Sequence, residues 1–283
     1  MRAQFFVSLI AFSALSSVSY AGITFGPVLA KPGESVRLVT YSDTLGGTIQ
    51  KKISGKSSAG TVHITRERDL VWTFREPGPD GARRGIVKVA KLTSSSRTVI
   101  DGKIDEGADF SPLNGKIFTM SKAPKGDWKF ELDGSVPFSR ITKEIDELKV
   151  YLKRDWYPAR EVNLGDSWEF DPSWIKLIVE RNFPKAQTIA TMRLRQIRSG
   201  LTHKSAVIDI TIQSSGGDFQ SNGSASEGSV KLTGQVTVNL KTMLDERLEL
   251  KGTVITHASS KGESTNLTLP IHLVVNKSFV YEH

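Results

Sequence analysis

The feature that most constrains this fold is an alternation of apolar and polar residues that runs through most of the chain. Its clearest stretch is residues 267–275, where Leu, Leu, Ile, Leu and Val occupy every second position without a break. Successive side chains of a β-strand point to opposite faces, so this spacing predicts a strand with one buried face. His272 falls between these residues and is expected on the opposite face.

Shorter runs with the same alternation recur along the chain, separated by turn residues, which is typical of an antiparallel sheet. Residues 123–127, Ala-Pro-Lys-Gly-Asp, predict a hairpin turn between two of them. Residues 214–228 are rich in Ser and Gly and predict a flexible loop. The predicted strands are residues 35–41, 61–65, 70–74, 85–90, 97–100, 116–120, 128–132, 190–197, 205–212, 229–240, 248–258 and 266–275.

One central segment departs from this pattern. Its apolar residues are spaced three and four apart, which predicts an amphipathic helix over residues 138–152. We therefore predict an α+β fold, predominantly antiparallel β, with a strongly curved, half-barrel-like sheet packed around this one central helix. The arrangement is similar to the half-barrels of periplasmic lipid and lipoprotein carriers, an analogy of fold only. The apolar residues of the segment are Phe138, Ile141, Ile145, Leu148 and Leu152.

The N-terminus has the three parts of a secretory signal peptide. Arg2 precedes an apolar stretch over residues 5–15, and small residues at Ser19 and Ala21 suit a cleavage site. The apolar stretch is shorter than the roughly 20 residues needed to span a bilayer. We expect a signal peptide over residues 1–21 and a β-rich domain over residues 22–283, in one piece or in two lobes divided near residue 158.

Cysteine content and charge restrict the compartment and the partners. The chain has no cysteine, so it has neither a disulfide nor a thiol to carry an acyl anchor, and an exported protein of this kind suits a bacterial periplasm or extracellular space. The net charge of +8 favours an anionic glycan or lipid as partner, and export argues against nucleic acid. No second apolar run reaches spanning length, so no transmembrane anchor is expected. The oligomeric state stays open.

Two short motifs invite a ligand-binding interpretation. Residues 55–57, Gly-Lys-Ser, would need a glycine at position 50 to form a phosphate loop, but that residue is Gln50, so a hairpin loop is predicted instead. Asp101, Asp105, Glu106 and Asp109 could supply oxygen ligands to a cation. They do not match the spacing of an EF-hand, and whether they bind a cation stays open.

Recognisable catalytic chemistry is missing from the sequence. It contains no Gly-x-Ser-x-Gly motif, and none of its five histidines forms the His-Glu-x-x-His pair of a zinc enzyme. Carboxylates are numerous, but no pair is singled out by its spacing. We therefore predict no catalytic, cofactor-binding or metal-ligating residue and favour a protein that is not an enzyme.

Aromatic and basic residues in the second half offer a tentative ligand surface. Trp156, Trp168 and Trp174 could line a carbohydrate or lipid site, and Arg193 and Arg195 lie on one face of a predicted strand. Packing in the core and a solvated strand face are the alternatives.

The most distinctive local sequence is Gly-Asp-Ser-Trp at residues 165–168, where Gly165 permits a tight turn and Asp166 can close it onto the backbone. From residue 111 to the C-terminus, the chain resembles a loose group of uncharacterised exported bacterial β-rich proteins. They have a similar central helix, then Gly-Asp-x-Trp, then several long strands. The resemblance implies no activity for any residue.

Three functions follow as hypotheses. The first is a non-catalytic envelope or periplasmic protein that binds an apolar or glycan ligand in a concave sheet. The second is a structural or assembly component of the cell envelope. The third is a hydrolase acting on an envelope polymer, which would need two convergent carboxylates in a cleft.

The signal-peptide pattern generates a first prediction. The protein isolated from its native host should begin at Gly22, because Ser19 and Ala21 occupy the −3 and −1 positions of a cleavage site. Intact-mass measurement checks this, and a mass that still includes residues 1–21 would contradict it.

Overall fold

The structure of the protein is a computed structural model. It describes residues 22–26, 28, 30–75, 83–122, 128–132, 141–142, 144–145, 156–172, 186–219 and 224–280.

Almost all of the described chain is β-strand, and the thirteen strands form one antiparallel sheet. The strands are β1 (Ser35–Asp43), β2 (Gly47–Ile53), β3 (Lys56–Phe74), β4 (Arg83–Ile100), β5 (Lys103–Phe110), β6 (Ile117–Lys122), β7 (Trp128–Leu132), β8 (Ser167–Glu169), β9 (Gln187–Ser199), β10 (Lys204–Phe219), β11 (Ala225–Asn239), β12 (Asp245–Ser260) and β13 (Glu263–Val280).

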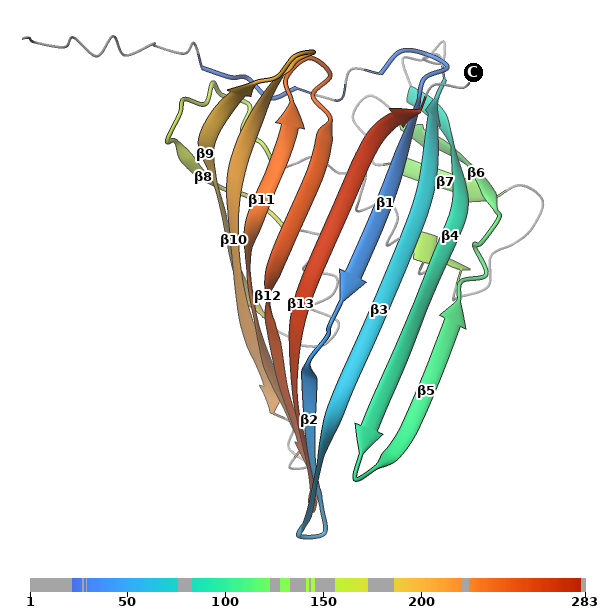
Figure 1. The fold of residues 1–283 in the computed structure, drawn as a ribbon, viewed down its shortest axis with the longest axis vertical. Coiled ribbons are helices and arrows are strands. Elements are labelled where there is room, and N and C mark those ends of the chain that lie inside the picture. Colours follow the sequence, from blue (N-terminus) through green and yellow to red (C-terminus); the bar gives the residue numbers. More distant parts are fainter. Residues whose placement is uncertain are drawn as a thin grey trace, which may run out of the picture.

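Neighbouring strands run in the order β7-β6-β4-β3-β1-β13-β12-β11-β10-β9-β8. The first and last long strands therefore pair at the centre, from Ser35 opposite Val280 to Asp43 opposite His272. Residues before and after position 158 belong to the same sheet. Figure 1 shows the long strands spreading apart at the end near β6–β8 and converging toward the β2–β3 hairpin.

β1 and β2 follow one another in the same position between β3 and β13. Asp43 is opposite His272, whereas Thr48 is opposite Thr268, so β1–β2 holds one residue more than β13 between these two pairs. The extra residue forms a bulge, which reverses the alternation of faces between the two strands. Thr44 fixes the bulge, because its hydroxyl accepts a hydrogen bond from the Ile64 amide at 2.8 Å.

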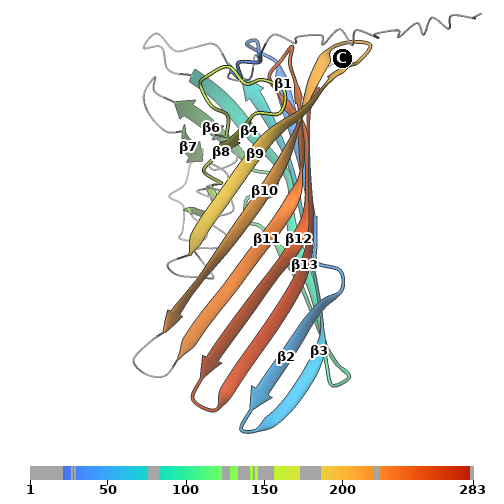
Figure 2. The same cartoon turned by 90° about the vertical axis from the view of Figure 1, so that its left-hand side faces the viewer.

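One face of the sheet, the core face, carries the hydrophobic core. Paired residues such as Leu38 and Leu70, or Leu248 and Val275, are buried there. β6, β7 and β8 lie on this side of the long strands (Figure 2). The buried cluster joins side chains of β4, β6, β9 and β13, so strands far apart in the sheet share one core. The opposite, outer face is mainly polar.

The predicted α+β class with a central helix is wrong. Within the described residues the fold is antiparallel β, and helical backbone is confined to Ile141, Thr142, Glu144 and Ile145. Ile141 and Ile145 are buried in the core. Apart from the four residues just named, segment 138–152 lies outside the described residues. At Ile141 and Ile145 the 3–4 spacing correctly marked residues that face the core, whereas Phe138, Leu148 and Leu152 lie outside the described residues. The sheet nevertheless supplies most of the core itself, because its strands are much longer than the sequence runs suggested.

Strand length was underestimated for a physical reason. The predicted runs at 61–65 and 70–74 are parts of the single strand β3, and those at 85–90 and 97–100 are parts of β4. The predicted loop at 214–228 is also largely strand, with Gly216 paired to Gly228. Strand pairing uses backbone groups, so Ser- and Gly-rich segments can extend a sheet when a neighbour fixes them. β6 and β7 pair antiparallel, as the predicted hairpin requires, while its turn at residues 123–127 lies outside the described residues.

Glycines on the core face allow neighbouring strands to approach at unusual closeness. A Cβ atom at Gly234 would lie 1.8 Å from the carbonyl oxygen of Glu249, and one at Gly252 would lie 1.8 Å from that of Lys231. A Cβ atom at Gly60 would lie 1.9 Å from the carbonyl oxygen of Val99. Such glycines mark the points where a sheet bends strongly.

We predict that Gly234→Ala and Gly252→Ala each destabilise the protein by about 1–3 kcal/mol, because the added methyl group must displace backbone. Gly26→Ala is the control, since its Cβ would meet nothing within 4 Å, and it should change stability by less than about 0.5 kcal/mol. Chemical denaturation measures all three. Equal midpoints would show that the sheet tolerates a Cβ at the bends.

Candidate functional site

The core face carries a line of aliphatic side chains that are only half buried. Leu267, Leu269, Ile271 and Leu273 of β13 occupy alternate positions on this face and are partly exposed, whereas Val275, next along the strand, is buried. We call these four residues the apolar strip. Its inner half, Ile271 and Leu273, packs against the main core cluster, and the strip runs from there toward the β2–β3 hairpin.

The strands beside β13 extend this apolar surface. Leu269 is opposite Val254 of β12, and Leu267 is opposite Ile49 of β2. Leu269 packs closely against Gly47, because a Cβ there would lie 2.8 Å from Leu269 Cδ2. Ile49 and Val62 are buried, 9% and 7% exposed, although neither belongs to the main core cluster. The strip therefore lies beside a second, smaller apolar group.

One flank of the apolar surface is polar. The core-face residues Val62, Ile64 and Arg66 of β3 are opposite Thr98, Ser96 and Ser94 of β4. A row of hydroxyl groups thus runs parallel to the strip, and Arg66 lies at its core end. An apolar surface bordered by a few polar groups is the usual composition of a site for an apolar or amphiphilic ligand.

The outer face carries a different candidate, a shallow polar groove of about 570 Å³ over β10–β12. Asp209, Gln235 and Glu249 lie directly opposite one another across these three strands. Gln235 Nε2 donates to Asp209 Oδ1 at 2.8 Å, and Arg195 Nη1 lies 3.5 Å from the same oxygen. The polar groups of the groove therefore already bind one another.

Glu249 is the most strongly held group of this groove. Arg247 donates to its carboxylate at 2.8 Å, and Lys251 and His272 each lie 3.0 Å from it. These three hydrogen bonds lower the pKa of Glu249 from 4.5 to about 2. His272 thus faces away from the apolar strip, as its position in the alternation predicted.

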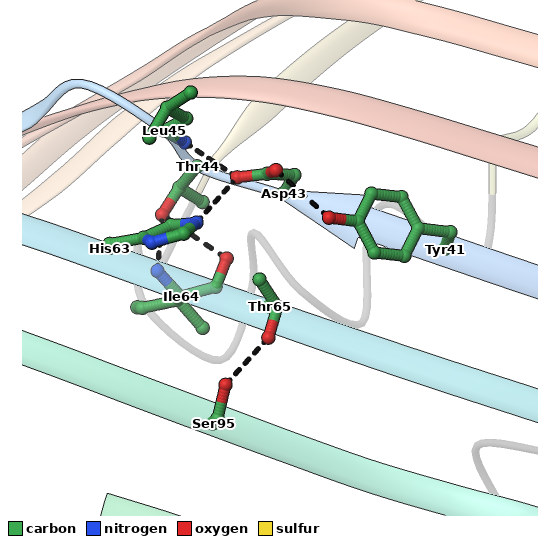
Figure 3. A network of polar contacts seen from close by, with 8 residues as sticks. All are labelled: Tyr41, Asp43, Thr44, Leu45, His63, Ile64, Thr65 and Ser95. Carbon is green, nitrogen blue, oxygen red and sulfur yellow. Dashed lines mark hydrogen bonds and ion pairs between the residues drawn. The ribbon is translucent and has the colours of Figure 1, made fainter. Parts of the chain in front are cut away.

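A second polar network closes the bulge between β1 and β2 (Figure 3). The Asp43 carboxylate accepts hydrogen bonds from the Tyr41 hydroxyl at 3.0 Å and the Leu45 amide at 2.7 Å, and His63 Nε2 lies 2.9 Å away. Partial burial would raise the pKa of Asp43, but the hydrogen bonds from Tyr41, His63 and Leu45 outweigh it and lower the pKa. Because each of these groups holds the backbone at the bulge between β1 and β2, the network has a structural role.

Glu249 of the outer groove does not suit the role of a glycosidase general acid. Asp209 and Glu249 are two strands apart, so their backbones are about 9–10 Å from each other. A general acid in such an enzyme needs a raised pKa so that it holds a proton near neutral pH. Glu249 has the opposite shift and remains ionised.

The structure places the predicted tryptophans in or against the core. Trp168 is buried, and its Nε1 donates to the carbonyl oxygen of Trp156 at 2.7 Å. The rings of Trp156 and Phe170 are 6.0 Å apart. Trp174 lies outside the described residues.

The predicted arginines lie on another surface. Arg193 and Arg195 alternate along β9 with the buried Met192 and Leu194, so they are on the outer face. The tryptophans and arginines therefore do not form one surface, and a ligand role for either set stays a prediction.

The short motifs occupy turns and an edge strand. Gly55 lies in the two-residue turn between β2 and β3, as the hairpin interpretation predicted. Asp101 lies in the turn between β4 and β5, and Glu106 of β5 pairs with Arg97 at 3.1 Å. The tight turn at Gly165 is confirmed, and there the Asp166 carboxylate accepts a hydrogen bond from the Asn163 amide at 3.0 Å. The described residues contain no group of three or more His, Asp or Glu placed to hold a metal ion.

The strip was not predicted as a site, although the sequence carries a signal for it. The unbroken alternation at 267–275 was interpreted only as one buried face. What it did not indicate is that burial stops partway along the strand, because this depends on which elements cover β13.

Comparisons with known proteins do not identify the chain. No family model and no curated protein matches it. One similar solved structure is an outer membrane channel from Pseudomonas putida F1, with 8% identity over 89% of this chain and 97% of that one and a TM-score of 0.24. Another is the binding domain of botulinum neurotoxin serotype C1, with 10% identity over 88% of this chain and 84% of that one and a TM-score of 0.14. These TM-scores are too low to establish a shared fold. Among the described residues, no helix has the length and apolar character to span a membrane.

The shifted pKa of Glu249 predicts a pH dependence. A carboxylate whose pKa is lower in the folded state stabilises the fold above its ordinary pKa, and this contribution is lost as the pH falls from about 4.5 toward 2. In Glu249→Gln, stability should therefore decline less steeply across this window than in the unmodified protein.

Denaturation midpoints measured at several pH values across this window give the test. Glu227→Gln, at an exposed position of β11, is the matched control and should follow the unmodified protein. Parallel curves for all three proteins would contradict the assignment of Glu249 as a strongly held carboxylate.

Proposed function

We propose that this protein is a non-catalytic, exported bacterial envelope protein that binds an elongated apolar ligand, such as an acyl chain, along the apolar strip. The main support is that Leu267, Leu269, Ile271 and Leu273 stay partly exposed in an unbroken line on the face that elsewhere forms the core. Aliphatic surface left in contact with water is destabilising, and a bound apolar chain would cover it.

The dimensions of the strip suit such a ligand. From Leu267 to Leu273 the strand advances six residues, or about 20 Å. One leaflet of a bilayer has hydrocarbon about 15 Å thick, half of the roughly 30 Å core, so the strip is long enough for one acyl chain. About twelve buried methylene groups at about 0.8 kcal/mol each contribute roughly 10 kcal/mol. This exceeds the lower estimates of the association cost, which ranges over about 4–15 kcal/mol.

A glycan ligand has less support among the described residues. The polar groups of the outer groove are already paired with one another, so a sugar would have to displace bonds such as that between Gln235 and Asp209. Trp168, which could stack on a sugar, is buried.

A role in envelope assembly is the second candidate, supported by β5. This edge strand is exposed throughout and, in the part of the chain that the structure describes, pairs only with β4. Its outward side chains Ile104 and Phe110 are 58% and 68% exposed. An exposed strand edge with apolar side chains can accept a strand from another protein.

Binding of a fluorescent fatty acid to the purified protein tests the proposed function. Leu269→Asn should weaken binding by about 10- to 100-fold, because the loss of one apolar contact is worth about 1.5–3 kcal/mol. Thr268→Asn changes the adjacent residue, which points to the outer face, and should leave affinity unchanged. Denaturation midpoints of both variants separate lost binding from lost folding. Equal affinities of folded Leu269→Asn, Thr268→Asn and the unmodified protein would overturn the proposal.

A further inference from the structure

The end of the sheet remote from the core carries a concentration of lysines. Lys51 and Lys52 lie at the end of β2, Lys56 at the start of β3, and Lys261 in the turn between β12 and β13. We call these four residues the lysine tip. In the described part of the chain none of them takes part in an ion pair, so their charge is available to a partner.

The two hairpins of the tip are joined and have defined shapes. The Ser54 amide donates to the Gly262 carbonyl oxygen at 2.9 Å, and Ile53 is opposite Glu263. Ser54 and Gly55 have φ of 50° and 82°, two successive positive values that match a tight two-residue hairpin turn. Figures 1 and 2 both show these hairpins side by side at the far end of the sheet.

An apolar side chain stands among these charges. Ile53 is 50% exposed at the turn, directly opposite Lys56 in the β2–β3 pairing. Ile49, Lys51 and Ile53 alternate on the core face, and Ile49 is opposite Leu267, the outermost residue of the apolar strip. An apolar surface therefore leads from the tip toward the strip, interrupted by one lysine whose stem is half buried.

We propose that the lysine tip docks on the surface of a bilayer that contains anionic lipids. The lysines match the negative charge of such a surface, and each lysine close to it strengthens binding about fivefold. Ile53 is placed to enter the boundary between head groups and acyl chains. The choice of a membrane over a soluble polyanion rests on the proposed function, because it relies on the path from Ile53 to the apolar strip.

Flotation of the full-length protein with vesicles tests the proposal. Binding should be strong to phosphatidylcholine vesicles that contain phosphatidylglycerol, weak to phosphatidylcholine alone, and reduced by salt. The triple variant Lys51→Gln, Lys52→Gln, Lys56→Gln should lose about 100-fold in partitioning, from about fivefold per lysine. Ile53→Ser keeps the charge and should lose several-fold.

The matched control removes the same charge elsewhere. Lys88, Lys116 and Lys129 are exposed and lie near the core end of the sheet, on or beside β4, β6 and β7, so replacing all three with Gln should have little effect. Equal losses in both triple variants would overturn the proposal, as would equal binding to the two kinds of vesicle. Binding to heparin or DNA without binding to anionic vesicles would assign the tip to a soluble polyanion and also overturn it.

Fatty-acid binding in solution separates this proposal from the proposed function. Loss of vesicle binding with fatty-acid affinity unchanged in the tip variants confirms the docking role. Absence of vesicle binding in the unmodified protein, with fatty-acid binding present, overturns the docking proposal alone. Vesicle binding without fatty-acid binding overturns the proposed function and leaves the electrostatic docking in place.

Discussion

The pairing of β1 with β13 holds the rest of the structure together. β2 continues the same contact, since it also pairs with β13. Without these two pairings the strands would form two separate groups, β1–β7 on one side and β8–β13 on the other, each with its own exposed edges. Nine residues of β1 join the first half of the chain to the last strand. This contact closes a loop of more than two hundred residues, and such closure has a large entropic cost that only a shared core can offset. The cluster that joins β4, β6, β9 and β13 is that core.

The two faces of the sheet meet different physical demands. On the outer face, cross-strand groups such as Asp209, Gln235 and Glu249 bind one another, which satisfies their hydrogen bonds without a ligand. On the core face, residues near β6–β8 such as Val87, Phe118 and Leu194 are fully buried, whereas the strip is partly exposed. Polarity alone would have pointed to the outer groove as the site, but its groups have partners among the described residues, while the aliphatic side chains of the strip are left partly in water.

The sequence predicted the local features better than the global ones. The alternation at 267–275, the antiparallel pairing of β6 with β7 and the turn at Gly165 each depend on neighbouring residues and were correct. Strand length was missed because pairing partners extended Ser- and Gly-rich segments into strands. The position of His272 beside Glu249 was missed because no local pattern specifies which strands become neighbours. The helix prediction failed at the level of the fold, since a 3–4 spacing shows an apolar stripe but not how much of the core it supplies.

The partial exposure of the strip follows from the lengths of the elements. β3 has 19 residues and β13 has 18, so each is about 60 Å long, whereas β6, β7 and β8 have 6, 5 and 3 residues. Strands this short cannot cover the whole face of long ones, so among the described residues the sheet extends beyond the elements that cover its core. A protein that only needed a stable core would end its strands where the core ends. This chain instead continues its apolar alternation past that point and has lysines at the far end. This combination is expected if a bound ligand covers the apolar strip and the lysine tip docks on an anionic surface.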